Sequence, residues 1–178
     1  MNDIFIEYMV KRKNTPQTAL IKAGIVAAAV FIAILCFLFS GILGPLSIIG
    51  PLVAFGALYG GYYLITSMNV EFEYAVTNGE IDFDKIIAQR KRVRLATANC
   101  RDAEAFGRYK QAEHANKPYQ TKIFACDSPD SQDVWYIAVR IKDKGLTLIA
   151  FNANDKMLNG VKPFLPRQIM HDAFNRIS

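Results

Sequence analysis

The feature that most constrains the fold is a long segment without charge in the first half of the chain. No Asp, Glu, Lys, Arg or His lies between Lys22 and Glu71. A helix needs about 20 apolar residues to cross the hydrocarbon core of a bilayer, and residues 22–43 and 46–67 each supply that length. The pattern predicts a transmembrane hairpin over residues 16–68.

A cleaved secretory signal is the competing interpretation of the first span. Its apolar run is too long, it shows no small-residue cleavage site, and a second span follows directly after Gly44-Pro45. Residues 69–178 are long enough for one small soluble domain with its own core.

Basic residues near the ends of the spans predict the orientation. They are Lys11, Arg12, Lys13, Lys22, Lys85, Arg90, Lys91, Arg92 and Arg94. Because the connecting loop has none, we expect both termini in the cytoplasm and the loop outside, as in a bacterial inner membrane protein. Cys36 lies in a span, and Cys100 and Cys126 fall in a domain in a reducing compartment, so a structural disulfide is not expected.

Residues 1–15 are expected to form an amphipathic helix on the membrane surface. Asp3, Glu7 and Lys11 follow one another at a spacing of four, with apolar residues on much of the rest of the segment.

Small residues in the second span predict close helix packing. Gly56 and Gly60 form a GxxxG motif, with Ala57 and Gly61 as a parallel pair. One interpretation is homo-oligomerisation through this face. The other, which the short loop favours, is packing against the Ala-rich first span.

The soluble part opens with a β-hairpin pattern. Apolar residues alternate around a two-residue turn, Asn78-Gly79, whose residue types supply the positive φ angles of a type I′ turn. Counting outward pairs Val76 with Ile81 and Tyr74 with Phe83. The opposite face then collects acids: Glu71, Glu73, Glu80, Asp82 and Asp84.

A basic run follows this hairpin and has two interpretations. Arg90, Arg92 and Arg94 alternate with Lys91, Val93 and Leu95. A third strand could present its arginines to Glu71, Glu73, Asp82 and Asp84 while the valine and leucine join the core. Alternatively, the cluster of Arg90, Lys91, Arg92 and Arg94 contacts anionic lipid headgroups.

Further strands are predicted near residues 105–110, 120–126, 134–142 and 146–152. A helix beginning at Pro166 closes the chain, with an apolar stripe of Ile169, Met170, Ala173, Phe174 and Ile177. The expected fold is a membrane hairpin plus a mainly-β domain: a pleckstrin-homology-like barrel of about seven antiparallel strands capped by the C-terminal helix. An open sheet crossed by a helix is the alternative.

The chain resembles an uncharacterised family of small bacterial two-span membrane proteins. The residues that carry this likeness are the basic N-terminal segment, the two spans, the module at residues 70–86 and the basic run at residues 90–94. More distantly, the layout is similar to bacterial pleckstrin-homology membrane proteins, which implies a fold more than a function.

Catalytic, metal and cofactor sites are not predicted. His114 and His171 have no cysteine or carboxylate at metal-ligand spacing, and both are expected at the surface. The acids of the hairpin lie on stiff strands, without the loop spacing that wraps calcium.

Residues 71–178 hold 17 basic and 14 acidic residues without an aromatic-basic stripe, so nucleic acid is not an expected partner. Trp135 is expected in the core.

The most consistent function is a membrane-anchored interaction or scaffolding module that is not an enzyme. It would present its domain to a protein partner and contact membrane lipid. The alternatives are an accessory subunit of a membrane transport or secretion complex, and a small-molecule-processing membrane enzyme. The enzyme would need a pocket where residues such as Asp102, Glu104, His114, Asp127 and Asp133 converge.

Overall fold

The structure is a computed structural model. It describes residues 4–175, with the backbone alone at positions 43, 45, 46 and 175. The contacts divide the chain into two compact units: Met1–Lys13 with Val70–Ser178, and Asn14–Asn69.

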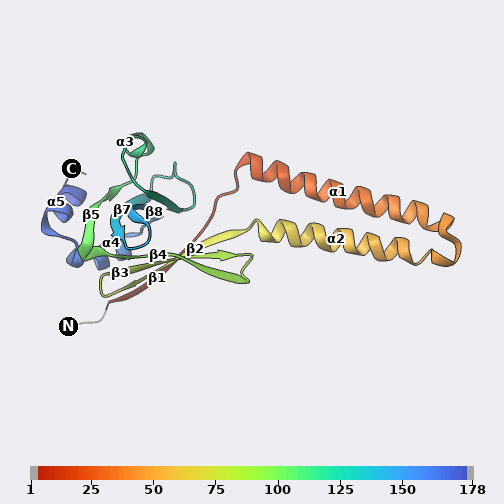
Figure 1. The fold of residues 1–178 in the computed structure, drawn as a ribbon, viewed down its shortest axis with the longest axis horizontal. Coiled ribbons are helices and arrows are strands. Elements are labelled where there is room, and N and C mark those ends of the chain that lie inside the picture. The colour runs from red at the N-terminus through yellow and green to blue at the C-terminus, as the bar shows by residue number, and fades with distance from the viewer. Residues whose placement is uncertain (1–3, 176–178) are drawn as a thin grey trace. The chain divides into compact units, whose positions relative to one another are not determined.

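The second unit is a helical hairpin. Helices α1 (Pro16–Ser40) and α2 (Ile49–Ser67) lie side by side and are joined by the 3-10 turn η1 (Gly41–Leu46) (Figure 1). Thr15 caps α1, because its hydroxyl oxygen accepts the backbone N–H of Thr18. At Gly44 φ is +53°, which glycine adopts without strain.

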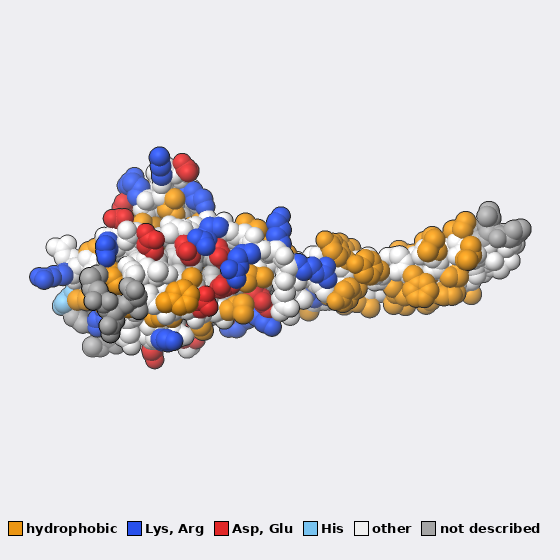
Figure 2. Space-filling view, turned by 90° about the horizontal axis from the view of Figure 1, so that it is seen from below, with side chains coloured by type: hydrophobic (Ala, Val, Ile, Leu, Met, Phe, Trp, Pro, Cys, Tyr) orange, Lys and Arg blue, Asp and Glu red, His pale blue; other side chains and the backbone are white. Residues whose placement is uncertain are grey.

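Both helices are long and apolar enough to span a membrane. Only 11% of the most apolar window of α1 and 17% of that of α2 are buried. Their exposed side chains are predominantly hydrophobic along the face that Figure 2 shows. Helices that are apolar all round and exposed require a lipid environment, so these findings support a membrane protein.

Small residues form the contact between the two helices, and of the expected ones Gly61 is among them whereas Gly56 and Gly60 are not. A Cβ added at Gly61 would lie 3.0 Å from Ala29 Cβ, and one added at Gly50 would lie 2.6 Å from a backbone oxygen of α1. A Cβ added at Gly56 or Gly60 meets nothing within 4 Å. The GxxxG pair therefore does not pack against the first span, because the α2 face toward α1 carries Gly50, Ala54 and Gly61 instead.

The first unit contains two four-stranded sheets. The first sheet has the order β1-β2-β3-β4 and is antiparallel throughout: β1 (Phe5–Lys11), β2 (Val70–Thr77), β3 (Glu80–Ile87) and β4 (Lys91–Asn99). The second has the order β5-β7-β8-β6: β5 (Ala103–Arg108), β6 (Thr121–Ala125), β7 (Val134–Ile141) and β8 (Gly145–Asn152). Strands β6 and β8 are parallel. The described residues thus form eight strands in two sheets, and not the expected barrel of about seven antiparallel strands.

The N-terminal segment is a strand, so the expected surface helix is wrong. Strand β1 pairs with β2 from Phe5↔Thr77 to Lys11↔Glu71. Residues four positions apart share a face in a strand as well as in a helix. The spacing of the charged residues therefore could not distinguish a helix from a strand. Ile6 is buried in the core, while its neighbours Phe5 and Glu7 are exposed. Residues 1–3 of the predicted helix lie outside the described residues.

The transmembrane hairpin is consequently an insertion between two paired strands. β1 and β2 are adjacent and antiparallel, and the Arg12 N–H donates to the Val70 carbonyl at 2.9 Å, directly beside the hairpin. The soluble domain therefore begins before the spans and resumes after them.

The predicted β-hairpin is confirmed. Strands β2 and β3 pair Val76 with Ile81 and Tyr74 with Phe83. Asn78 and Gly79 have φ angles of +48° and +93°, as a type I′ turn requires.

The core lies between the two sheets and is closed by C-terminal helices. Rings of Tyr74, Phe83 and Phe151 contact one another with centroids 5.2 to 5.9 Å apart. Trp135 is buried in this core, as expected. Helices α4 (Asp155–Val161) and α5 (Arg167–Asn175) follow β8, with the 3-10 turn η3 (Lys162–Phe164) between them.

The C-terminal helix packs as its apolar stripe predicts. Ala173 is buried, and Phe174 stacks 6.2 Å from Phe106 and 5.6 Å from Trp135. Ile177, the last residue of the stripe, lies outside the described residues. Two short elements complete the fold: η2 (Cys100–Asp102) and α3 (Gln111–His114).

Candidate functional site

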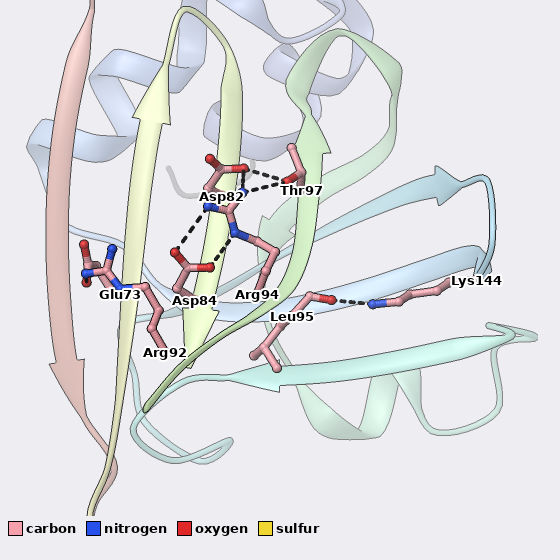
Figure 3. Close-up of polar contacts among 8 residues, drawn as sticks. All are labelled: Glu73, Asp82, Asp84, Arg92, Arg94, Leu95, Thr97 and Lys144. Atoms are coloured by element: carbon pink, nitrogen blue, oxygen red, sulfur yellow. Dashed lines mark hydrogen bonds and ion pairs between the residues drawn. The ribbon is translucent and has the colours of Figure 1, made fainter. Parts of the chain in front are cut away.

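The basic run on β4 forms ion pairs with the acidic face of the first sheet. Arg94 contacts the carboxylates of Asp84 and Asp82, the second at 2.6 Å, and Arg92 contacts Glu73 (Figure 3). The pKa of the Arg94 guanidinium is raised, chiefly by its hydrogen bond to Asp84. Two of the four lipid-headgroup candidates therefore pair internally.

A bulge in β4 changes what the rest of the run contacts. Phe83 pairs with Ala96 and Asp84 pairs with Arg94, so Leu95 is an extra residue on this strand. The Lys144 ammonium donates to the Leu95 carbonyl at this point (Figure 3). Leu95 packs against the core, but Val93 is exposed. The expectation that Val93 joins the core is wrong.

Two cations of the run remain, Arg90 and Lys91. Arg90 lies in the turn between β3 and β4, where its backbone N–H donates to the Ile87 carbonyl at 3.0 Å. Lys91 is the first residue of β4. Its side chain is exposed and forms no ion pair with any residue in the described range. By register, Val70 pairs with Ile87 and Ile87 pairs with Lys91. Lys91 therefore lies at the end of the sheet from which the chain enters and leaves the transmembrane hairpin.

A hydrogen-bonded cluster around Asp127 fixes the end of the N-terminal segment. The Asp127 carboxylate accepts Lys13 Nζ at 2.7 Å, Asn152 Nδ2 at 2.9 Å and Ser131 Oγ at 3.0 Å. The backbone N–H of Lys13 also donates to the Asp127 carbonyl. Burial raises the pKa of Asp127, but these hydrogen bonds outweigh it and hold the pKa below its usual range. Lys13 is the last residue of the domain before the hairpin, so the cluster anchors that point.

His114 is buried, although a surface position was expected. Its ring stacks on Tyr109 with centroids 5.4 Å apart and meets the Tyr136 ring edge-on at 4.2 Å. Nδ1 lies 3.1 Å from the Tyr119 hydroxyl, and Nε2 is buried without a hydrogen-bond partner among the described residues. Burial and the nearby charge of Lys117 lower the pKa of His114.

His114 and the tyrosines around it pack over a small hydrophobic cluster on the second sheet. Its buried residues are Cys126, Val134, Leu148 and Ala150, with Tyr109, Tyr119 and Tyr136 packed over them. Burial raises the pKa of the Cys126 thiol to about 12, so this cysteine is an unreactive packing residue. His114 thus fills a hydrophobic contact between the segment after β5 and the sheet.

An open groove of about 660 Å³ runs along strand β5. It is lined by residues 104–108 of β5, by Tyr136 of β7, by Lys110 and Glu113, and by Ile169, Asp172 and Ala173 of α5. β5 is the end strand of its sheet (Figure 1). A groove along a sheet edge suits an extended ligand better than a compact one.

The candidate acid and base residues do not gather in one place. Glu104 lines the groove and pairs with Arg140 at 3.3 Å, Asp127 pairs with Lys13, and His114 is enclosed by tyrosines. Within residues 4–175, no group of three or more His, Cys, Asp or Glu side chains is arranged to hold a metal ion.

Sequence reasoning missed the groove and the Asp127 cluster. A weak signal for the groove is the pair of small residues Ala105 and Gly107, both of which line it. The Lys13–Asp127 contact joins residues more than a hundred positions apart, and no local pattern indicates it.

Comparisons with known proteins give one family. Residues 2–171 match the family described as Bacterial PH-like domain (DUF6106), which covers β1, the helical hairpin and both sheets. No curated protein and no solved structure matches the chain. The two four-stranded sheets and the C-terminal helix fit this description. The chain therefore belongs to the bacterial PH-like domain family DUF6106.

Proposed function

We propose that the protein is a membrane-anchored interaction module that holds a PH-like domain at the cytoplasmic face of the bacterial inner membrane. It acts by binding and local concentration, not by catalysis. The observation that carries the proposal is the insertion of the apolar hairpin between the paired strands β1 and β2. The absence of basic residues from the loop between the helices supports the cytoplasmic placement.

The domain is connected to the helical hairpin at two points, and this arrangement suits a scaffold. The chain leaves the domain at Lys13 and re-enters it at Val70, and both points are held by hydrogen bonds inside the domain. A domain confined to the membrane plane meets membrane-associated partners at a high effective concentration, which strengthens weak contacts.

Crosslinking in intact cells followed by purification from native membranes tests the proposal. We expect the same protein partner to be recovered reproducibly with the wild-type chain. A matched control carries a charge change on the sheet face that bears the ion pairs, Glu80→Lys, and should recover the partner equally. Recovery of the protein alone under every condition would argue against a scaffold.

Contact with anionic lipid is a second candidate role, and Lys91 supports it. This exposed cation lies at the end of the sheet where β2 begins, at Val70. A basic residue near an anionic surface contributes about 1 kcal/mol to binding. Lys91→Glu should weaken the retention of fluorescent anionic lipid around the purified protein, whereas Lys142→Glu, at an exposed turn, should not. Equal retention by both variants and the wild type removes the lipid site.

The open face of α2 supports a third role as an accessory subunit of a membrane complex. Gly56 and Gly60 leave space that α1 does not fill, and a small-residue ridge of this kind lets another helix approach closely. The same face would serve a homo-oligomer. Gly60→Leu should abolish either assembly, measured by the mass of the purified complex, while Gly24→Leu on α1, also in open space, should not.

A further inference from the structure

The side chain of Lys22 joins the two ends of the helical hairpin. Its ammonium donates to Asn14 Oδ1 at 3.0 Å and to Asn69 Oδ1 at 2.9 Å. Asn14 lies two residues before α1 begins, and Asn69 lies two residues after α2 ends. These three residues, the Lys22 cluster, therefore meet at the end of the unit where the chain enters and leaves the hairpin.

The Lys22 cluster carries one positive charge that its own unit does not balance. Lys22 is the single charged residue in the sequence from position 14 to position 69. It forms no ion pair with any carboxylate in residues 4–175. Its two hydrogen-bond partners are neutral amides, and they occupy two of the three N–H groups of the ammonium. The charge of the cluster therefore favours a negative ligand.

The free donors of the cluster indicate an oxyanion. Asn14 and Asn69 give their side-chain oxygens to Lys22, so each keeps two N–H donors on Nδ2. Neither of these amide nitrogens donates to a residue within the described range 4–175. Both asparagines are exposed, and Lys22 is half-buried. Three neighbouring side chains thus offer N–H groups to solvent-accessible space, and phosphate oxygens accept such donors well when one of them is charged.

The position of Lys22 along α1 indicates where the anion comes from. Lys22 is the seventh residue of α1, and the uncharged residues 23–40 that follow extend about 27 Å. That length nearly fills a hydrocarbon core of about 30 Å. Lys22 then lies at the boundary with the headgroups, and its bonds to residues outside both helices turn its ammonium away from the core. The anion at this depth is a phospholipid phosphate.

Exposed tyrosines support this placement. Tyr59 and Tyr62 lie on the half of α2 nearest Asn69, and both are exposed. Tyrosines on lipid-facing surfaces concentrate at the boundary between the hydrocarbon core and the headgroups. The same end of both helices therefore has the side chains of a membrane interface.

We propose that the Lys22 cluster binds the headgroup phosphate of an anionic phospholipid in the leaflet next to the ends of the hairpin. The phosphate oxygens accept N–H groups of Lys22, Asn14 and Asn69. A zwitterionic lipid also carries a phosphate, but residues 14–69 hold no carboxylate to pair with its ammonium group. The cluster therefore prefers a lipid with a net negative charge. This inference rests on the proposed membrane anchoring and adds a lipid contact that does not involve Lys91.

Native mass spectrometry of the full chain in a non-ionic detergent tests the proposal, with phosphatidylglycerol and phosphatidylcholine as probes. The wild type should bind one phosphatidylglycerol about fivefold more tightly than phosphatidylcholine, the factor that one basic residue near an anionic headgroup contributes. Lys22→Gln keeps a donor for the two asparagines but loses the charge, so this preference should disappear. Lys22→Arg keeps the charge and should retain the preference.

Further variants separate lipid binding from a purely structural role. Asn69→Ala removes one amide while the charge remains, and it should weaken the binding of phosphatidylglycerol. Gln17→Ala is the matched control, because Gln17 is exposed on the first turn of α1 and lies outside the cluster. It should bind both lipids as the wild type does. If Lys22 only held the hairpin ends together, Lys22→Gln would lower the melting temperature without changing the ratio of the two lipid affinities.

Three results would overturn the proposal. The first is equal binding of the two lipids to the wild type, and the second is an unchanged preference in Lys22→Gln. The third is displacement of phosphatidylglycerol by excess inorganic phosphate, which would assign the cluster to a soluble anion. A preference that Lys91→Glu abolishes and Lys22→Gln keeps would place the anionic lipid at the sheet instead. None of these results affects the recovery of a protein partner from native membranes, so the scaffold and the lipid site can fail separately.

Discussion

At the level of single residues, the ion pairs on the first sheet explain two opposite charge runs with one cause. Asp84 is almost fully buried, with 9% of its side chain exposed, and Arg94 is its cation. An arginine at that position is therefore needed for the stability of the sheet, whereas Lys91 forms no ion pair within residues 4–175.

Arg94→Ala should lower the stability of the domain by about 1–2 kcal/mol, because it leaves a buried carboxylate without its charged partner. Lys91→Ala should change stability by less than about 0.5 kcal/mol, as is usual for an exposed residue without partners. Thermal unfolding of the full chain in detergent measures both. Equal losses for the two variants would contradict the pairing.

The turn glycine provides a second test at this scale. Gly79 has φ of +93°, and a Cβ there would lie 2.6 Å from the Phe164 ring. Gly79→Ala should therefore cost about 1–3 kcal/mol of stability through backbone strain and steric overlap. Ala88→Gly is the matched control, because Ala88 already has φ of +54° and should tolerate glycine without loss. Chemical denaturation compares the two.

His114 should make the stability of the domain depend on pH. Its pKa is lowered in the folded protein, so the neutral ring is the native form. The unfolded chain takes up a proton as the pH falls below about 6.5, and stability is lost from there down through the folded-state pKa. The charged groups near the ring are Glu113, Lys117 and Lys122.

His114→Phe keeps an aromatic ring in the cluster and removes the titration. Between about pH 7.5 and pH 5, its melting temperature should fall less than that of the wild type. The matched control is His171→Phe, at an exposed position on α5, which should keep the wild-type pH dependence. A wild-type slope in His114→Phe would show that another group carries the effect.

Residue patterns predicted the local contacts and missed the distant ones. The pairings around Asn78-Gly79 and the arginine–acid contacts follow from a two-residue period counted from one turn. The burial of His114 depends on Tyr109 and Tyr119, each five residues away in irregular chain, and on Tyr136 of β7. No local period reports such a contact.

At the level of elements, β1 shows why a strand can be hidden in a sequence. Its partner β2 lies beyond the whole transmembrane hairpin, so no turn pattern connects the two. The strands β6, β7 and β8 were predictable because short, mostly apolar runs are bounded by polar turns. The helix α5 was predictable from its apolar stripe, and α4 lacked a comparable signal.

Removing the hairpin tests the role of β1. A chain in which residues 14–69 are replaced by a four-residue Asn-Gly-containing turn should fold as a soluble domain, because β1 and β2 then form an ordinary β-hairpin. Residues 69–178 alone lack β1, expose Phe72 and Tyr74 at the sheet edge, and should aggregate or unfold. Circular dichroism and gel filtration distinguish these outcomes.

If residues 69–178 fold as well as the joined chain, β1 is dispensable and its assignment to the domain is wrong. A joined chain with Ile6→Asp serves as control. It retains the connection but places a charge at a buried position and should be destabilised.

At the level of the whole molecule, the topology ties the two ends of the hairpin to one side of the membrane. The strands that precede and follow the spans pair with each other, so both must lie in the same compartment. In the proposed arrangement this compartment is the cytoplasm, which the basic residues on the flanks favour.

Cysteine accessibility in sealed membranes tests this arrangement most directly. In a chain with the native cysteines replaced, Ile42→Cys probes the exposed turn of the hairpin and Pro129→Cys probes an exposed loop of the domain. In intact spheroplasts, a membrane-impermeant maleimide should label position 42 and leave position 129 unlabelled until the membrane is opened. Labelling of position 129 in intact spheroplasts would contradict the account. So would labelling of position 42 only after the membrane is opened, with the protein in the soluble fraction.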